Sequence, residues 1–318
     1  MRITIATSPA EIERLRPAWE RLLRPEHHTA FQEFELNRLA AAHFAERESA
    51  YIVLAESDSS LALIPAAVRQ STGEITLLGE TLFDYRDVLH RGSSEALEAA
   101  WTEIAKLNRP LSFHALRHEA RSRWEAIPTV SFANAPLVRH QDMDCDEFRA
   151  AHNKLGMFYR RIIKRGAHFH AHNGKNKNLV RTIYDCKAAQ FPQERNNVFL
   201  DPARREFMVL ACEAMGARCE IFTLEDGKQL VAALVTLREE TARRFYTIYF
   251  DPAWAKFSPG VVLIYEVSAR TLAEGLDCDY MTGEYGYKNR LATDMEPLLK
   301  VQASAEELAH AVSRKLAA

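Results

Sequence analysis

The segment between residues 276 and 288 holds the densest group of side chains that could do chemistry. It reads LDCDYMTGEYGYK, so Asp279 falls near the end of a predicted strand and Glu284, Tyr285, Tyr287 and Lys288 follow in a glycine-rich loop. A carboxylate can accept a proton from an attacking amine or hydroxyl, a phenol can return one to a leaving thiolate, and an ammonium can neutralise a phosphate. These five residues are therefore candidate catalytic groups for acyl transfer. The composition is equally typical of a solvated, charged loop.

A second candidate site lies just upstream, where an aromatic strand ends and a helix begins. Ser258 suits the helix N-cap, Pro259 suits its first turn, and Gly275 suits its C-terminal cap. The free N–H groups at the helix start, with Gly260 permitting close approach, would suit a phosphate or pyrophosphate. A crossover helix that binds no ligand fits the same pattern. The candidate binding residues are Phe257, Ser258, Pro259, Gly260 and Val261.

A run of positive charge lies between residues 149 and 184. It contains nine Arg and Lys residues and no Asp or Glu, although the whole chain has a formal net charge of −2. Such local positivity in a nearly neutral protein indicates a phosphate-bearing or polyanionic partner, and we expect Arg160 and Arg161 to bind anionic groups of the substrate. A solvated helix face is the alternative interpretation.

Three histidines in the same region share one face of a predicted strand. His168, His170 and His172 alternate in the sequence HFHAH, a spacing that would suit metal ligands on one strand face. Neither Cys nor a carboxylate lies nearby in the sequence to complete a site. We therefore expect no metal.

The elements that would position these groups alternate between strands and helices in both halves of the chain. Alternation of this kind predicts a mixed α/β sheet, and an Asp226-Gly227 turn predicts a hairpin in the second half. A polar break near residues 139–148 separates two halves of similar element order. We therefore predict two domains, residues 1–144 and 145–318.

Composition restricts the class of protein further. The chain has 318 residues, of which 47% are hydrophobic and 26% charged, and it lacks both an apolar leader and a run of about 18 uncharged apolar residues. Its five Cys residues are scattered without a CxxC pair, which is typical of reduced thiols. These features predict a soluble cytoplasmic protein without membrane insertion.

Several motifs occur together in a recognisable order. They are Ala232-Ala233 in a hairpin strand, an aromatic strand at residues 245–250, Ser258-Pro259-Gly260, Gly275, Asp279 with Gly283, and Tyr287-Lys288. In this order they resemble the C-terminal signature of the CelD/BcsL-type acetyltransferases, a group associated with bacterial cellulose and exopolysaccharide biosynthesis. In the first half, Gly79, Asp84, Tyr85 and Asp87 resemble a further stretch of the same group. The resemblance covers most of the chain and is strongest over about residues 145 to 295.

The resemblance implies a fold of two tandem GNAT-like domains, because the group is also similar to the FemA/FemX-type peptidyltransferases. It implies that the pyrophosphate of an acyl-CoA, most simply acetyl-CoA, lies at residues 257–261. It further implies that the first domain contributes to the acceptor side, with Asp84 and Tyr85 as candidate substrate-binding residues. This chain departs from the usual GNAT loop, since it has one Gly and a Pro where two small residues are common.

The expected function is therefore acyl transfer to an amine or hydroxyl of a saccharide-related acceptor. Two other functions stay open on the sequence. One is an aminoacyl-tRNA-dependent peptidyltransferase of the FemX kind, which the basic run would suit. The other is a non-catalytic GNAT-like module that binds a nucleotide sugar or a synthase partner, which the degenerate loop would allow.

Overall fold

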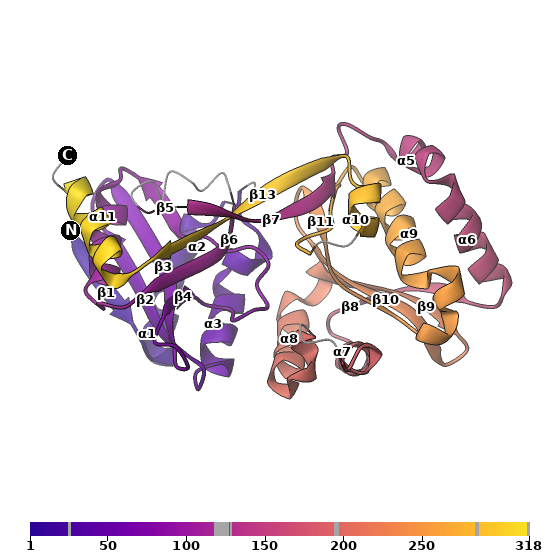
Figure 1. The fold of residues 1–318 in the computed structure, drawn as a ribbon, viewed down its shortest axis with the longest axis horizontal. Helices are drawn as coiled ribbons and strands as arrows, with labels where there is room; N and C mark the ends of the chain where they lie inside the picture. The colour runs from indigo at the N-terminus through magenta and orange to yellow at the C-terminus, as the bar shows by residue number, and fades with distance from the viewer. Residues whose placement is uncertain (25–26, 118–126, 128, 194–196, 284–285, 317–318) are drawn as a thin grey trace. The chain divides into compact units, whose positions relative to one another are not determined.

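The chain folds into two compact units, shown in Figure 1. The computed structural model describes residues 1–318 apart from 25–26, 118–126, 128, 194–196, 284–285 and 317–318. Unit 1 consists of Met1–Ala133 together with Pro297–Ala318, and unit 2 consists of Asn134–Glu296. The C-terminal segment thus belongs to the same unit as the N-terminus. The domain boundary predicted after residue 144 stays a prediction.

Unit 1 is a mixed sheet with helices on both faces. Its strands follow the order β1-β2-β3-β4-β6-β13, and β5 pairs with β3. The strands are β1 (Arg2–Ala6), β2 (Glu48–Glu56), β3 (Ser60–Arg69), β4 (Ile75–Leu77), β5 (Leu89–Gly92), β6 (Leu111–Arg117) and β13 (Asp294–Ala303). The helices are α1 (Pro9–Arg14), α2 (Arg16–Leu22), η1 (Ala30–Gln32), α3 (Phe34–His43), α4 (Glu95–Ala105) and α11 (Ala305–Leu316).

The core of unit 1 lies on both faces of its sheet, as strand β2 illustrates. Val53 and Ala55 are buried in the cluster that includes residues of α4 and α11, whereas Ile52 and Leu54 are buried with residues of α1, α2 and α3. Successive side chains of a strand point to opposite faces, so a strand covered on both sides must be apolar at every position. Each fully buried Val, Leu or Ile side chain contributes about 1.5–3 kcal/mol.

In unit 2 the strand directions are again mixed, and the strand order is β7-β12-β11-β10-β9-β8. Its strands are β7 (Thr129–Val138), β8 (His168–Asn173), β9 (Cys219–Asp226), β10 (Gln229–Arg238), β11 (Ala242–Phe250) and β12 (Asp277–Asp279). Its helices are α5 (Cys145–Ala151), α6 (Asn153–Lys164), α7 (Lys177–Gln190), η3 (Val198–Leu200), α8 (Pro202–Met215), η4 (Gly216–Arg218), η5 (Pro252–Phe257), α9 (Pro259–Ala273) and α10 (Gly286–Leu291).

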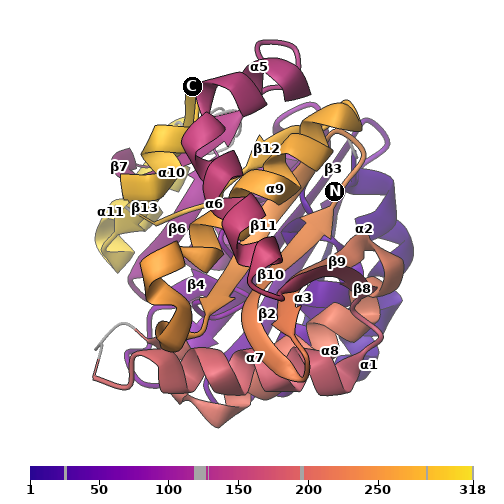
Figure 2. The same cartoon turned by 90° about the vertical axis from the view of Figure 1, so that its right-hand side faces the viewer.

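Helices cover both faces of the sheet in unit 2. Figure 2 shows α6 and α9 on one face and α7 and α8 on the other. Helix α9 is almost wholly buried because it connects the parallel strands β11 and β12 and packs between the sheet and α6. It ends in a Schellman motif: Leu276 N–H donates to Thr271 O, Gly275 N–H donates to Leu272 O, and Gly275 has φ +70°.

The predicted hairpin turn at Asp226-Gly227 is confirmed, since it joins β9 to β10. The Ser8 side chain caps α1 together with Glu11. The segment from Cys145 to Lys164 forms two helices, α5 and α6, because the chain breaks at His152, whose φ and ψ are −114° and 31°. The break allows both α5 and α6 to contact α9. Strands β7 and β13 and helix α11 were not predicted.

Candidate active site

The parallel strands β11 and β12 pair over only three residues and then separate. Ala242, Arg243 and Arg244 pair with Asp277, Cys278 and Asp279, after which β12 ends while β11 continues to Phe250. The edge of β11 that faces away from β10 is therefore not paired with β12 beyond Arg244. Free main-chain N–H and C=O groups at such an edge can bind a substrate.

A β-bulge at Tyr246 changes which side chains face each side of the sheet. In the pairing with β10, Val235 is opposite Thr247 and Thr236 is opposite Phe245, so Tyr246 is the extra residue. Tyr246 donates a hydrogen bond to Met208 of α8, and Thr247 lies 3.2 Å from the Tyr184 hydroxyl of α7. Two consecutive side chains thus face the α7 and α8 side.

The α9 side of β11 is formed by Phe245, Ile248 and Phe250, which pack with residues of α9. The ring of Phe245 meets that of Tyr280 edge to face, with 5.1 Å between centroids. The Tyr280 hydroxyl lies 3.0 Å from Ser268 Oγ, and Ser268 donates its own proton to Ile264 O. Burial raises the pKa of Tyr280 well above its usual range, so this phenol stays neutral.

A cavity of about 450 Å³ occupies the place where β11 and β12 separate. Its size is within the range of small-molecule sites in proteins. Side chains from both faces of the sheet line it, so the cavity connects the α9 side with the α7 side. The lining residues are Lys187, Phe191, Asn197, Val198, Phe199, Leu234, Phe245, Tyr246, Thr247, Ile248, Phe250, Ile264, Tyr280, Thr282, Tyr287 and Lys288.

Two of the predicted catalytic residues, Tyr287 and Lys288, line this cavity. Lys288 is buried, and its ammonium donates to the main-chain oxygens of Met281 at 3.3 Å and Thr282 at 2.5 Å. Its bonds therefore tie α10 to the segment that follows β12. Glu284 and Tyr285, which were predicted with them, lie outside the described residues.

Asp279, predicted as a base, does not line the cavity. Its carboxylate is buried, forms an ion pair with Arg244, and accepts a 2.7 Å hydrogen bond from Met281 N–H. Arg244 also pairs with Glu239 at 2.8 Å. Met281 has a left-handed backbone, φ 58°, which is unusual for a residue with a long side chain. The position of Asp279 is thus that of an anchor for the turn that ends β12.

The predicted donor-binding residues, 257–261, lie at the start of α9 and are not among the cavity-lining residues. The expected N-cap bond of Ser258 is absent: its backbone is left-handed, φ 51°, and its side chain makes no capping bond. A Cβ on Gly260 would lie 3.3 Å from Phe250 Cδ1 and 3.4 Å from Ile248 Cγ1. Gly260 therefore brings α9 close to two side chains that line the cavity.

The basic run divides into two parts. On α7, Lys177 pairs with Glu213 and Arg181 pairs with Glu206. On α6, both predicted substrate-binding residues, Arg160 and Arg161, are exposed. Among the residues that the structure describes, no carboxylate pairs with either of them. The α6 part is therefore the one whose positive charge is not compensated.

Asp84 and Tyr85 lie in unit 1, in the segment that follows β4. Tyr85 is fully buried and its carbonyl accepts a hydrogen bond from the Gln32 side chain. Asp84 is half-buried. Their role in binding an acceptor stays a prediction.

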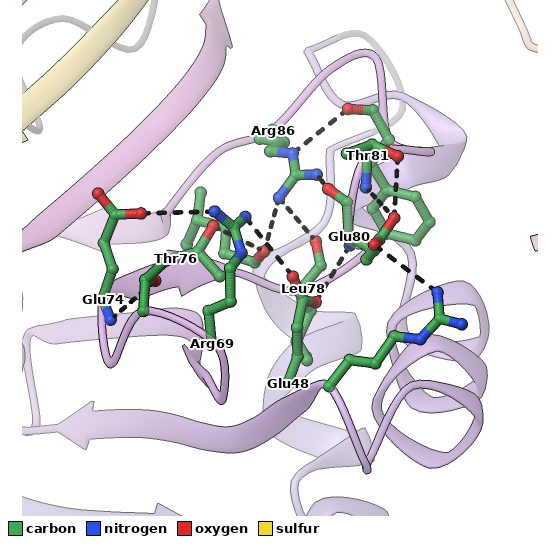
Figure 3. A network of polar contacts seen from close by, with 12 residues as sticks. Glu48, Arg69, Glu74, Thr76, Leu78, Glu80, Thr81 and Arg86 are labelled. Atoms are coloured by element: carbon green, nitrogen blue, oxygen red, sulfur yellow. Dashed lines mark hydrogen bonds and ion pairs between the residues drawn. The ribbon is translucent and has the colours of Figure 1, made fainter. Parts of the chain in front are cut away.

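Arg86 lies between Tyr85 and Asp87 and was not among the candidate residues predicted from the sequence. Arg86 is buried, and its guanidinium donates to the main-chain oxygens of Leu77, Leu78 and Glu80, as Figure 3 shows. Burial lowers the pKa of Arg86 to about 10, so it stays charged at neutral pH. Glu48, also buried, accepts from Glu80 N–H, and burial raises the pKa of its carboxyl.

Sequence reasoning missed several residues of the cavity, including Lys187, Phe199, Tyr246, Thr247 and Tyr280. The sequence predicted an aromatic strand at residues 245–250, and that signal pointed to the correct strand. The bulge and the separation from β12 leave no such mark in the sequence. Among the described residues, no group of His, Cys, Asp and Glu could hold a metal, and no helix has the length and apolar character needed to span a membrane.

Comparison with known proteins agrees with this architecture. Residues 151–289 match the family model described as an acetyltransferase (GNAT) domain. The fold is that of GNAT-type acyltransferases. The predicted mixed α/β, GNAT-like fold is thereby confirmed, whereas the CelD/BcsL type stays a prediction.

Several similar solved structures extend over nearly the whole chain. A C-terminal domain (DUF2156) from Agrobacterium fabrum, described as part of a lysylphosphatidylglycerol synthetase, has a TM-score of 0.62 at 11% identity and covers 97% of each chain. FemX has a TM-score of 0.54 at 10% identity, covering 94% of this chain and 97% of its own. A tandem GNAT protein from the clavulanic acid biosynthesis pathway has a TM-score of 0.52 at 11% identity, covering 96% and 99%. No curated protein matches the chain.

Proposed function

We propose that the protein transfers an acyl group, most simply acetyl from acetyl-CoA, to an amine or hydroxyl acceptor bound in unit 2. The observation that carries this proposal is the cavity at the separation of β11 and β12, which opens to both faces of the sheet. A donor on the α9 side and an acceptor on the α7 side would meet there without a covalent enzyme intermediate. Holding both reactants in one cavity supplies the proximity that direct transfer needs.

The chemistry follows from the groups that line the cavity. The acceptor nitrogen or oxygen attacks the thioester carbonyl, the C–S bond breaks, and the acceptor loses one proton while the thiolate gains one. We propose that N–H groups on the free edge of β11 polarise the carbonyl and that Tyr287 protonates the thiolate. Lys288 would hold the loop that carries Thr282 in place.

The acceptor class that we propose is a sugar or a polysaccharide precursor, as the resemblance to CelD/BcsL-type proteins implies. Phe191, Phe199 and Tyr246 provide aromatic surfaces in the part of the cavity next to α7 and α8. The polar groups of Lys187 and Asn197 lie in the same part. Aromatic surface with a few polar groups is what a site for a ring with hydroxyls requires.

Calorimetric titration with acetyl-CoA tests the proposal. We expect saturable binding by the wild-type protein and loss of binding in Thr282→Trp, because Thr282 lines the cavity and is only half-buried. The matched control is Thr182→Trp, at an exposed position on α7 that does not line the cavity. Absence of binding by the wild-type protein, or equal binding by Thr282→Trp, would contradict acyl-CoA as the donor.

A second candidate donor is aminoacyl-tRNA, which the uncompensated positive charge of α6 favours. FemX is among the proteins with a similar fold. If this donor is used, transferase activity in a cell extract should disappear on treatment with ribonuclease and persist when acyl-CoA is removed. The reverse result would leave acyl-CoA as the donor.

A further inference from the structure

Strand β8 is the last strand of the sheet in unit 2, and Figure 2 shows it next to β9. It pairs with β9 in one unbroken register, from His168 opposite Glu225 to Asn173 opposite Glu220. On its outer side, no strand of the described residues pairs with it. Proteins often protect such an edge with Pro, Lys or a bulge, and β8, with the sequence HFHAHN, has none of these. The outer edge can therefore accept an added strand.

The main-chain groups of alternate residues on β8 point away from β9. Gly174, directly after β8, donates its N–H to Cys219 O at 2.9 Å and so continues the register of the pair. In an antiparallel pair, residues bonded to the neighbouring strand alternate with residues that are not. The N–H and C=O groups of Phe169 and Ala171 therefore face the outer edge. Neither residue has a main-chain partner in the part of the chain that the structure describes.

Side chains on both faces of β8 reach solvent. His168 and His170 are exposed on one face. On the other face Ala171 is exposed, and the Phe169 ring stacks on that of Phe222 with 5.9 Å between centroids. A strand added at this edge would therefore lie beside imidazoles on one face and beside a small apolar surface on the other.

The strand lies between exposed cations. Lys164 and Arg165 precede it and Lys175 follows it, and no carboxylate of the described residues pairs with any of the three. On β9, Glu225 accepts a hydrogen bond from a threonine and lies 3.5 Å from a histidine of β8. Asp226, which lies near Gly166, offsets only part of the positive charge. The excess of positive charge around the edge favours an acidic ligand.

A second copy of this chain would fit the edge poorly. If β8 paired antiparallel with β8 of another copy about its centre, Arg165 of each copy would lie opposite Lys175 of the other. Like charges directly opposite each other destabilise a strand pair. An acidic strand would meet the same two positions with opposite charge.

We propose that the outer edge of β8 binds an acidic, extended segment of a partner protein as an added strand. Hydrogen bonds to the main chain of Phe169 and Ala171 would fix its register, and the cations at the two ends of β8 would attract its carboxylates. No residue of β8 lines the cavity at β11 and β12, so this inference does not depend on the proposed function.

The test measures the binding of three fluorescein-labelled peptides of eight residues to the full chain by fluorescence anisotropy. In the first peptide Glu alternates with Val, and in the second Lys replaces each Glu. The third has the sequence of the first with its four central amides N-methylated. We expect the first to bind at least about 10-fold more tightly than the other two, because the second carries the wrong charge and the third cannot donate main-chain hydrogen bonds. Added salt should weaken its binding.

Two variants locate the peptide on the edge. Ala171→Pro removes an outward N–H but no bond to β9, and it should bind the Glu peptide about 10-fold more weakly, whereas Ala171→Val keeps the N–H and should stay within about twofold. Lys164→Gln/Lys175→Gln should weaken binding about threefold or more, and Lys177→Gln/Arg181→Gln, at positions already paired with acids, should stay within about twofold. Thermal unfolding of each variant checks that it is folded.

Amide hydrogen exchange of the wild type tests the edge without any substitution. The amides of Phe169 and Ala171 should exchange rapidly in the free protein and at least about 10-fold more slowly with the Glu peptide bound. The amides of His168 and His170, which point toward β9, should change little.

Four results would overturn the inference: no binding of the Glu peptide, equal binding of all three peptides, undiminished binding by folded Ala171→Pro, or unchanged exchange at Phe169 and Ala171. A wild-type dimer that becomes a monomer in Ala171→Pro, measured by sedimentation, would overturn it in favour of a second copy at this edge. Binding of tRNA but not of the Glu peptide, lost in Lys164→Gln/Lys175→Gln alone, would overturn it in favour of RNA.

Discussion

Each unit contains a parallel strand pair that separates soon after it forms, and the two gaps are occupied differently. In unit 2, β11 and β12 separate after Arg244 and leave a cavity of about 450 Å³. In unit 1, β4 and β6 pair only at Ile75 and Leu111, and the chain itself returns so that Arg86 bridges to Leu116 further along β6.

The polar groups freed at the gap in unit 1 are satisfied from within. Arg86 N–H donates to Ala115 O, and the Arg86 guanidinium donates to the carbonyls of Leu77 and Leu78 at the end of β4. The cavity that Arg86 lines there has a volume of only about 10 Å³, roughly one water-sized site. Similar strand arrangements can thus provide either a ligand site or a closed core, depending on whether one side chain fills the gap.

The largest expected effect tests whether unit 1 needs Arg86 to fill the gap between β4 and β6. We expect Arg86→Met to lower the free energy of unfolding by about 3–5 kcal/mol, because the carbonyls of Leu77, Leu78 and Glu80 would lose their donor and buried Glu48 would lose a nearby positive charge. Urea denaturation followed by fluorescence measures this. Arg14→Met, at an exposed position on α1, is the control, and a loss below about 1 kcal/mol in Arg86→Met would contradict the account.

In unit 2, the groups at the gap should affect activity rather than stability. We expect Tyr287→Phe to lower kcat about 100-fold, equivalent to about 2.7 kcal/mol, because the leaving thiolate loses its acid. The affinity for acetyl-CoA should change little. Release of free thiol in the presence of amine and amino-sugar acceptors measures the rate, with Tyr51→Phe in unit 1 as control. An unchanged kcat would exclude Tyr287 as the acid.

Substitution of Asp279 distinguishes a structural role of this carboxylate from a catalytic one. We expect Asp279→Asn to cost about 2 kcal/mol of stability, because Arg244 loses one of two carboxylate partners while the amide oxygen can still accept from Met281 N–H. Thermal unfolding and kcat are measured together. If Asp279 is instead a general base, kcat should fall by a factor of 100 or more with little change in stability.

At neutral pH, the smallest effect on stability concerns His114 on β6 in unit 1. Burial, with Arg86 and Arg69 adding repulsion, lowers the pKa of His114 from 6.5 to about 3. Between these values the unfolded chain binds one more proton than the folded chain, so the stability of unit 1 falls as the pH is lowered through this range. The slope from this group is about 1 kcal/mol per pH unit.

His114→Gln should therefore make acid denaturation less steep below pH 6.5, as measured by urea midpoints at several pH values. His310→Gln, at an exposed position on α11, should leave the slope unchanged. An unaltered slope in His114→Gln would show that this histidine is solvated in the folded state.

Much of the fold could be predicted because its signals are local. The Ser8 cap, the Asp226-Gly227 turn and the apolar strands of both halves depend on residues a few positions apart. Of the candidate site residues, Tyr287 and Lys288 line the cavity and Gly260 lies beside two of its lining residues, whereas their roles stay a prediction. Asp279 could not be assigned from the sequence, because its ion-pair partner, Arg244, is 35 residues away.

The sequence by itself determined the class of fold, the central aromatic strand, the position of α9 and the uneven distribution of positive charge. Periodicity, capping residues and charge runs are properties of short segments, and short segments are what a sequence displays directly. The tertiary structure alone decided the bulge at Tyr246, the gap between β11 and β12, the filling of the other gap by Arg86, and the return of β13 and α11 to unit 1. Each of these depends on contacts between residues far apart in the chain, which no local pattern specifies.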